Sequence, residues 1–85
     1  MTVTMQVRIE QIQSGTAARA VGLPLAGHGR DANRAVASLT RGVQAWCHGL
    51  RAAGVLEESL RSHGMTWRDG GNEVQIEAQI VPITT

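Results

Sequence analysis

The chain contains no phenylalanine, no tyrosine and no lysine, and it has only two tryptophans and one cysteine. A single cysteine excludes an intrachain disulfide and every redox or metal motif built from paired cysteines. No apolar run approaches the roughly 20 residues that a membrane-spanning helix needs. Because aromatic residues are so scarce, we expect valine, isoleucine, leucine, alanine and methionine to fill the core.

The chain also has almost no excess of positive over negative charge. Eight basic residues, all arginine, are balanced by seven acidic residues, for a net charge of +1. This imbalance is too small to attract nucleic acid or a membrane by bulk charge. The first ten residues alternate in polarity and do not form a basic and then apolar leader, so we expect a soluble cytoplasmic protein without membrane contact. A length of 85 residues predicts one domain, residues 1–85, with a small stability margin that self-association would increase.

Alternating hydrophobicity predicts strands toward both ends of the chain. Apolar residues occupy every second position from Thr2 to Glu10, which indicates a strand with one buried face. A weaker second strand is predicted at Thr16–Val21, because alanine has little strand preference, and Leu25–Ala26 predicts a short third strand. Met65–Arg68 and Glu73–Val81 predict two more strands, joined as a hairpin by the sequence Asp-Gly-Gly-Asn.

The middle of the chain carries helical signals. Apolar residues recur at three- and four-residue steps after Asp31, a residue type that caps helix N-termini. Gly54 suits a left-handed C-terminal cap, so one long helix is expected between these two residues. A shorter helix is predicted at Val55–His63, ending at Gly64. The predicted fold class is α+β, a mostly antiparallel sheet with one long and one short helix packed on one face.

No group of residues has the spacing of a catalytic or metal site. The histidines, His28, His48 and His63, lie in three separate segments, and none has a second ligand three or four residues away. Cys47 falls within the apolar stripe of the long helix, where a thiol lacks both exposure and a base. We therefore predict no metal, no cofactor and no enzymatic activity. An enzyme would need a pocket around His28.

The segment from Val21 to Trp46 resembles a known domain. It reads V-G-L-P-L-A-G-H-G-R-D and continues into a helix with A-V-A-S-L-T-R-G-V-Q-A-W. A Leu-Pro turn, two glycines and a capped helix in this order resemble the HicB-like antitoxin domain over about half of the chain. The matching residues are Val21, Leu23, Pro24, Gly27, Gly29, Asp31, Ala35, Val36, Leu39 and Trp46.

The resemblance implies a noncatalytic domain that binds a protein partner such as a toxin. Three features depart from the family pattern. The second strand carries Ala17, Ala18 and Ala20 where the family has aromatic residues, and Ala26-Gly27-His28 replaces the usual cysteine after the turn. A hairpin is expected where full antitoxins of this type continue into a DNA-binding module. A stand-alone member of the fold is therefore the closer expectation.

We expect the function to reside in an interface. A near-neutral surface, no catalytic constellation and regular strands near both ends favour a protein-interaction module that also self-associates into a dimer or higher oligomer. The last predicted strand is expected to form this contact, with Val74, Ile76 and Ile80 packing and Glu77 and Gln79 at the rim.

A small nucleic-acid-binding module is the alternative. Arg30, Arg34 and Arg41 cluster along the start of the predicted long helix, where guanidinium groups could contact phosphates. This alternative predicts salt-sensitive binding to a duplex or to RNA, lost when the three arginines are replaced together.

Overall fold

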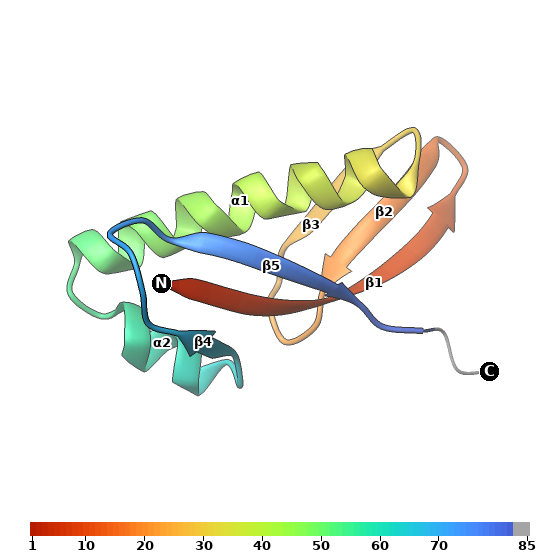
Figure 1. Cartoon of the computed structure of the whole chain (residues 1–85). Coiled ribbons are helices and arrows are strands. Elements are labelled where there is room, and N and C mark those ends of the chain that lie inside the picture. Colours follow the sequence, from red (N-terminus) through yellow and green to blue (C-terminus); the bar gives the residue numbers. More distant parts are fainter. Residues whose placement is uncertain (83–85) are drawn as a thin grey trace.

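A computed structural model describes residues 1–82, and within them the chain forms the predicted α+β fold of five strands and two helices (Figure 1). The order of strands and helices agrees with the sequence prediction, including the short third strand. The elements are β1 (Thr2–Ile12), β2 (Gly15–Ala20), β3 (Ala26–Gly29), α1 (Ala32–Ala52), α2 (Leu56–Ser62), β4 (Thr66–Arg68) and β5 (Gln75–Ile80).

β1 is the central strand of the sheet. Its second half pairs antiparallel with β2, which in turn pairs antiparallel with β3. Its first half pairs with two strands, since residues 2–4 lie between β4, which is antiparallel, and β5, which is parallel. Val7 likewise has Ala20 of β2 on one side and Ile80 of β5 on the other. β2 and β4 therefore share one edge of β1, and β5 occupies the opposite edge.

β4 and β5 do not form the predicted hairpin. The loop between them crosses the amino end of β1, with positive φ angles of 144° at Gly70 and 71° at Gly71, and the backbone N–H of Gln75 then donates to the carbonyl of Met1 at 2.9 Å. A hairpin would have used only the three residues of β4, whereas the crossing lets six residues of β5 pair with β1. The prediction of a turn at these glycines is confirmed, but the prediction that the turn joins β4 and β5 as a hairpin was wrong.

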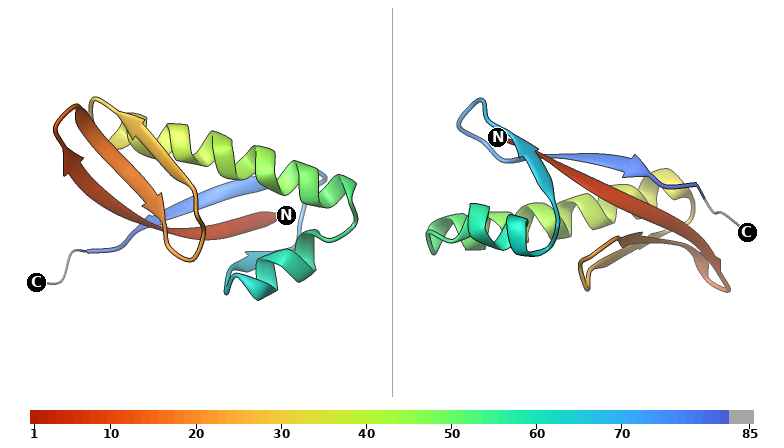
Figure 2. Two further views of the ribbon diagram at one scale, coloured as in Figure 1. Left: turned by 180° about the vertical axis from the view of Figure 1, so that it is seen from behind. Right: turned by 90° about the horizontal axis from the view of Figure 1, so that it is seen from below.

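α1 packs along one face of the sheet (Figure 2). Ala35, Leu39, Val43 and Cys47 form its buried stripe, and they join the apolar residues of β1 in one core. The side chain of Asp31 accepts a hydrogen bond from the backbone N–H of Arg34, which confirms the predicted N-cap.

The second helix completes this core. Leu56 and Leu60 of α2 are buried in it, as the sequence predicted. Gly54 and Gly64 follow the two helices with φ angles of 76° and 70°, so both act as the left-handed stops that were expected.

β3 was predicted at Leu25–Ala26, but it lies at Ala26–Gly29 and includes both glycines. A Cβ atom at Gly27 would lie 2.3 Å from the backbone nitrogen of Leu39 and 2.4 Å from the carbonyl oxygen of Ala35. A Cβ atom at Gly29 would lie 2.7 Å from the backbone nitrogen of Ala35. These glycines therefore allow the backbone of β3 to lie directly against α1. Strand propensity could not indicate this, because glycine is depleted in strands.

The opposite face of the sheet is polar. Two ion pairs lie on this face. Arg19 to Glu10, at 2.8 Å, joins the neighbouring strands β2 and β1, and Arg68 to Glu77, at 3.0 Å, reaches from β4 across β1 to β5. The outer face also carries the exposed side chains of Gln6, Arg8, His28, Gln75 and Gln79. Neither helix within residues 1–82 combines the length and the apolar character needed to cross a membrane.

Candidate functional site

β5 has one edge on β1 and a second edge that no strand within residues 1–82 pairs with. The N–H groups of Gln75 and Val81 donate to β1 at 2.9 and 2.8 Å. Backbone groups alternate in direction along a strand, so the N–H and C=O groups of Ile76, Ala78 and Ile80 point to the other edge. This edge, which we call the free edge of β5, presents three donors and three acceptors.

The free edge has a defined start and end. The carbonyl oxygen of Val74, just before β5, accepts a hydrogen bond at 2.9 Å from the side-chain amide of Gln44 on α1. Pro82, two residues after β5, has no N–H to donate. The donors and acceptors of Ile76, Ala78 and Ile80 therefore lie between a carbonyl that is already bonded and a residue that has no N–H.

The two faces of β5 differ in polarity. On the α1 side, Ile76 and Ala78 are half-buried and pack against the core, and Ile80 is 58% exposed. On the outer face, the side chains of Gln75, Glu77 and Gln79 are exposed. An approaching strand would therefore meet an apolar row on one side and a polar row on the other.

Four of the five predicted interface residues lie on β5 itself: Ile76, Glu77, Gln79 and Ile80. The fifth, Val74, is fully buried, so its side chain already packs in the core of its own chain. Glu77 is engaged by Arg68, which holds its carboxylate on the outer face. The alternating pattern located the strand but could not show which of its edges is free, since that depends on the crossing loop.

Three further residues shape this edge and were not singled out from sequence. Ala78 lies at its centre, Gln44 covers its start, and Pro82 closes its end. Pro82 has a local sequence signal, because proline has no N–H to donate and so ends strand pairing. The roles of Ala78 and Gln44 depend on the parallel placement of β5, and no local pattern signals them.

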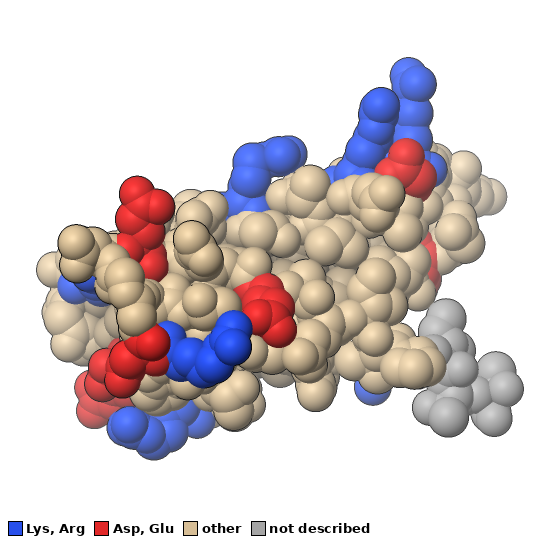
Figure 3. Space-filling model, viewed as in Figure 1, with Lys and Arg blue, Asp and Glu red and all other residues tan. Residues whose placement is uncertain are grey.

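The three arginines of the alternative site are all exposed, and basic side chains stand out from the surface over α1 (Figure 3). Arg30 precedes the helix, and the Nε atom of Arg34 lies 3.9 Å from a carboxylate oxygen of the cap residue Asp31. Arg41 follows Arg34 by about 10 Å along the helix axis. They therefore form a row along the helix that includes one carboxylate.

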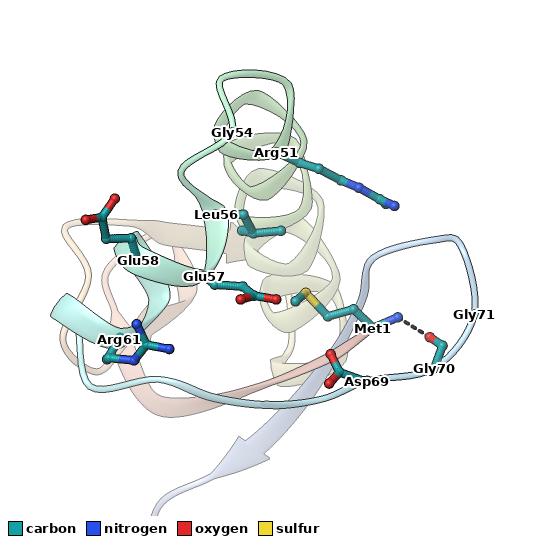
Figure 4. Close-up of a pocket in the computed structure, with 10 residues that line it drawn as sticks. All are labelled: Met1, Arg51, Gly54, Leu56, Glu57, Glu58, Arg61, Asp69, Gly70 and Gly71. Atoms are coloured by element: carbon teal, nitrogen blue, oxygen red, sulfur yellow. Dashed lines mark hydrogen bonds between the residues drawn. The ribbon is translucent and has the colours of Figure 1, made fainter.

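A cleft of about 650 Å³ lies away from the free edge, between α2 and the crossing loop (Figure 4). Glu57 points into it toward the side chain of Met1, whereas Glu58 points away. Its lining residues are Met1, Arg51, Gly54, Leu56, Glu57, Glu58, Arg61, Asp69, Gly70 and Gly71.

The charged groups of this cleft are exposed and partly engaged elsewhere. Arg51 donates to the carbonyl of Asn72 at 2.7 Å, and the guanidinium of Arg61 lies 5.7 Å from the ring centre of Trp67. The carboxylates of Glu57 and Asp69 are exposed to water, whereas acid–base catalysis relies on groups in a partly dry setting.

The histidines remain apart from one another. His28 is exposed on β3, His48 is exposed on α1, and His63 follows α2, where its Nδ1 atom lies 2.8 Å from the carbonyl of Ser59. Within residues 1–82 no three metal-binding side chains come together. Cys47 is fully buried, and burial raises the pKa of its thiol.

No protein-family model matches the chain, and neither the curated proteins nor the solved structures gave a match. The similarity to HicB-like domains stays a prediction from the sequence, and the functional argument rests on the free edge of β5.

Proposed function

We propose that the protein is a cytoplasmic, noncatalytic protein-interaction module that binds a strand of another polypeptide along the free edge of β5. A second copy of the same chain is one such partner. A protein such as a toxin, which the resemblance to HicB-like domains implies, would use the same edge. The observation that carries this proposal is the uninterrupted row of backbone donors and acceptors beside an apolar row that ends in Ile80, 58% exposed.

An edge of this kind favours strand addition for two reasons. Each hydrogen bond formed across it contributes a net stabilisation of about 0.5–1.5 kcal/mol. Proteins usually protect edge strands with charges, prolines or bulges, or by keeping them short. Between Ile76 and Ile80 the residues whose backbone faces the free edge are all apolar, and none is proline.

Two other strands also have an unpaired edge within residues 1–82, β4 and β3, and neither offers an equal site. β4 has only three residues. β3 has only four residues, and Gly27 and Gly29 are two of them. A short strand with few side chains gives a partner little area to pack against. β5 is therefore the better candidate.

The proposal is tested by light scattering after size exclusion, over a dilution series. The wild-type chain is expected to show at least twice its chain mass of 9.1 kDa at high concentration. Ile80→Lys introduces a charge at the exposed apolar position, so its mass should fall toward one chain at concentrations where the wild type is still associated. Gln75→Lys is the matched control on the outer face of the same strand, and it should associate like the wild type.

Circular dichroism of each variant shows whether the fold is retained. A wild-type chain that stays monomeric throughout the series would contradict self-association. An Ile80→Lys variant that associates as well as the wild type would contradict the free edge as the site.

A further inference from the structure

We propose that two copies of the chain pair β5 with β5 in antiparallel orientation, about a twofold axis that passes through Ala78. This inference rests on the function proposed above and specifies the partner, the direction and the register. A twofold axis is the symmetry by which the same surface patch on two identical chains can close a dimer.

The hydrogen-bonding groups of the free edge fit this register. With Ala78 opposite Ala78, Ile76 faces Ile80 of the second copy, and Ile80 faces Ile76 of the second copy. Each opposed pair exchanges two backbone hydrogen bonds in an antiparallel ladder, so these three pairs form six. All the donors and acceptors of the free edge are then paired.

The ends of the strand fit the same register. In the next pair of residues that face each other across the edge, two residues beyond Ile76 and Ile80, Val74 lies opposite Pro82 of the second copy. Pro82 has no N–H to offer, and the Val74 carbonyl, its acceptor in such a pair, already accepts from Gln44. Pro82, which lacks an N–H, therefore lies opposite the Val74 carbonyl, which already has a hydrogen-bond donor in Gln44.

Neighbouring registers lose bonds. If the axis passed through Glu77, the N–H of Ile80 would face the Val74 carbonyl that Gln44 occupies. If it passed through Gln79, the carbonyl of Ile76 would face Pro82, which cannot donate. Twofold symmetry makes each loss occur twice. Two of the six free-edge donors therefore lack a vacant acceptor with the axis at Glu77, and two of the six free-edge acceptors lack a donor with the axis at Gln79.

The side chains favour the same choice. With the axis at Ala78, Glu77 faces Gln79 of the second copy on the outer face. With the axis at Glu77, two carboxylates would lie directly opposite each other, which is destabilising. On the other face, Ile76 and Ile80 of the two copies form one apolar row with the small Ala78 at its centre. α1 contacts β3 and β2 more extensively than β5, so it covers this end of the sheet least.

Disulfide trapping tests the register. Ala78→Cys places two thiols in an opposed pair with Cα atoms about 5.5 Å apart, within the range of about 4.4–6.8 Å that a disulfide bridges. Glu77→Cys places its two thiols diagonally, about 7–8 Å apart. Under mild oxidation, Ala78→Cys is expected to form a covalent dimer at least tenfold faster than Glu77→Cys. The wild-type chain is the control, since its own Cys47 is buried.

Oxidation of a mixture of two variants, each with one introduced cysteine, provides a second test of the register. Glu77→Cys combined with Gln79→Cys should yield the mixed disulfide, because those two positions oppose each other about the Ala78 axis. Faster trapping of Glu77→Cys alone would overturn the register and leave self-association standing. A dimer by light scattering that none of these variants traps would overturn pairing through β5, and a chain that is monomeric throughout would contradict the self-association proposed above.

Discussion

At the scale of single residues, the backbone contact at Gly27 is the tightest constraint on the helix–sheet packing. Gly27→Ala forces a Cβ into backbone atoms of α1 that lie 2.3–2.4 Å away. We expect it to lower the free energy of unfolding by about 1–3 kcal/mol or more, the usual effect of overpacking.

Gly42→Ala is the matched control, because a Cβ added there meets nothing within 4 Å. It should raise the free energy of unfolding by up to about 1 kcal/mol through helix propensity alone. Urea unfolding of both variants at one protein concentration measures the difference. Equal effects of the two substitutions would mean that β3 does not lie against α1 as described.

Ionisation of Cys47 is expected to make the free energy of unfolding depend on pH in the alkaline range. Burial raises the pKa of its thiol above the ordinary value of 9.0. Between pH 9.0 and the raised value, the unfolded chain has lost this proton and the folded chain retains it. The contribution of this group to stability is therefore constant below about pH 8 and declines as the pH rises through the ordinary pKa.

The free energy of unfolding of wild-type and Cys47→Ala chains, measured from neutral to alkaline pH, tests this. Cys47→Ala lowers stability at every pH by opening a small cavity, but it should remove part of the alkaline decline. Identical slopes for the two chains would show that the thiol ionises alike in the folded and unfolded states.

At the scale of elements, the alternating β1 and the striped, capped α1 could be predicted from sequence. Their burial follows from periods of two and of 3.6 residues. β3 could not be placed, since its position depends on the absence of a Cβ at Gly27 and not on strand propensity. The partner of β5 could not be predicted either, because Asp69–Asn72 carries hairpin residues but spans the end of β1. The strand β5 could thus be predicted from the sequence, and its free edge could not.

Proline substitutions on β5 test which edge is free. The N–H of Ala78 points to the free edge, so Ala78→Pro should leave the chain folded and abolish association. The N–H of Gln79 points to β1, so Gln79→Pro should lower the melting temperature by removing a ladder bond. Melting curves and light scattering separate the two results. The reverse outcome, with Ala78→Pro unfolded and Gln79→Pro folded, would mean that the strand is turned the other way.

At the scale of the whole molecule, a chain of 85 residues buries a limited core, and the proposed association would add to its stability. Pairing through Ala78 would join the two sheets edge to edge and place both copies of α1 on the same side. This arrangement leaves the polar outer face and the arginine row uncovered, so the dimer would keep further surfaces for other partners.

The arginine row separates the proposed function from the nucleic-acid alternative. Replacing Arg30, Arg34 and Arg41 by glutamine together should leave the mass of the associated protein unchanged, since none of them lies on β5. Fluorescence anisotropy with a labelled duplex and a labelled RNA at low salt is expected to show no binding by the wild type. Salt-sensitive binding that this variant loses would establish the alternative.

The most direct test of the central claim is amide hydrogen exchange along β5, resolved by residue and measured at high and low protein concentration. The amides of Gln75, Glu77 and Gln79 face β1 and should be protected at both concentrations. The amides of Ile76, Ala78 and Ile80 should be protected only at high concentration and should exchange rapidly on dilution. Rapid exchange of these three at every concentration would contradict the claim that the free edge of β5 is the binding site.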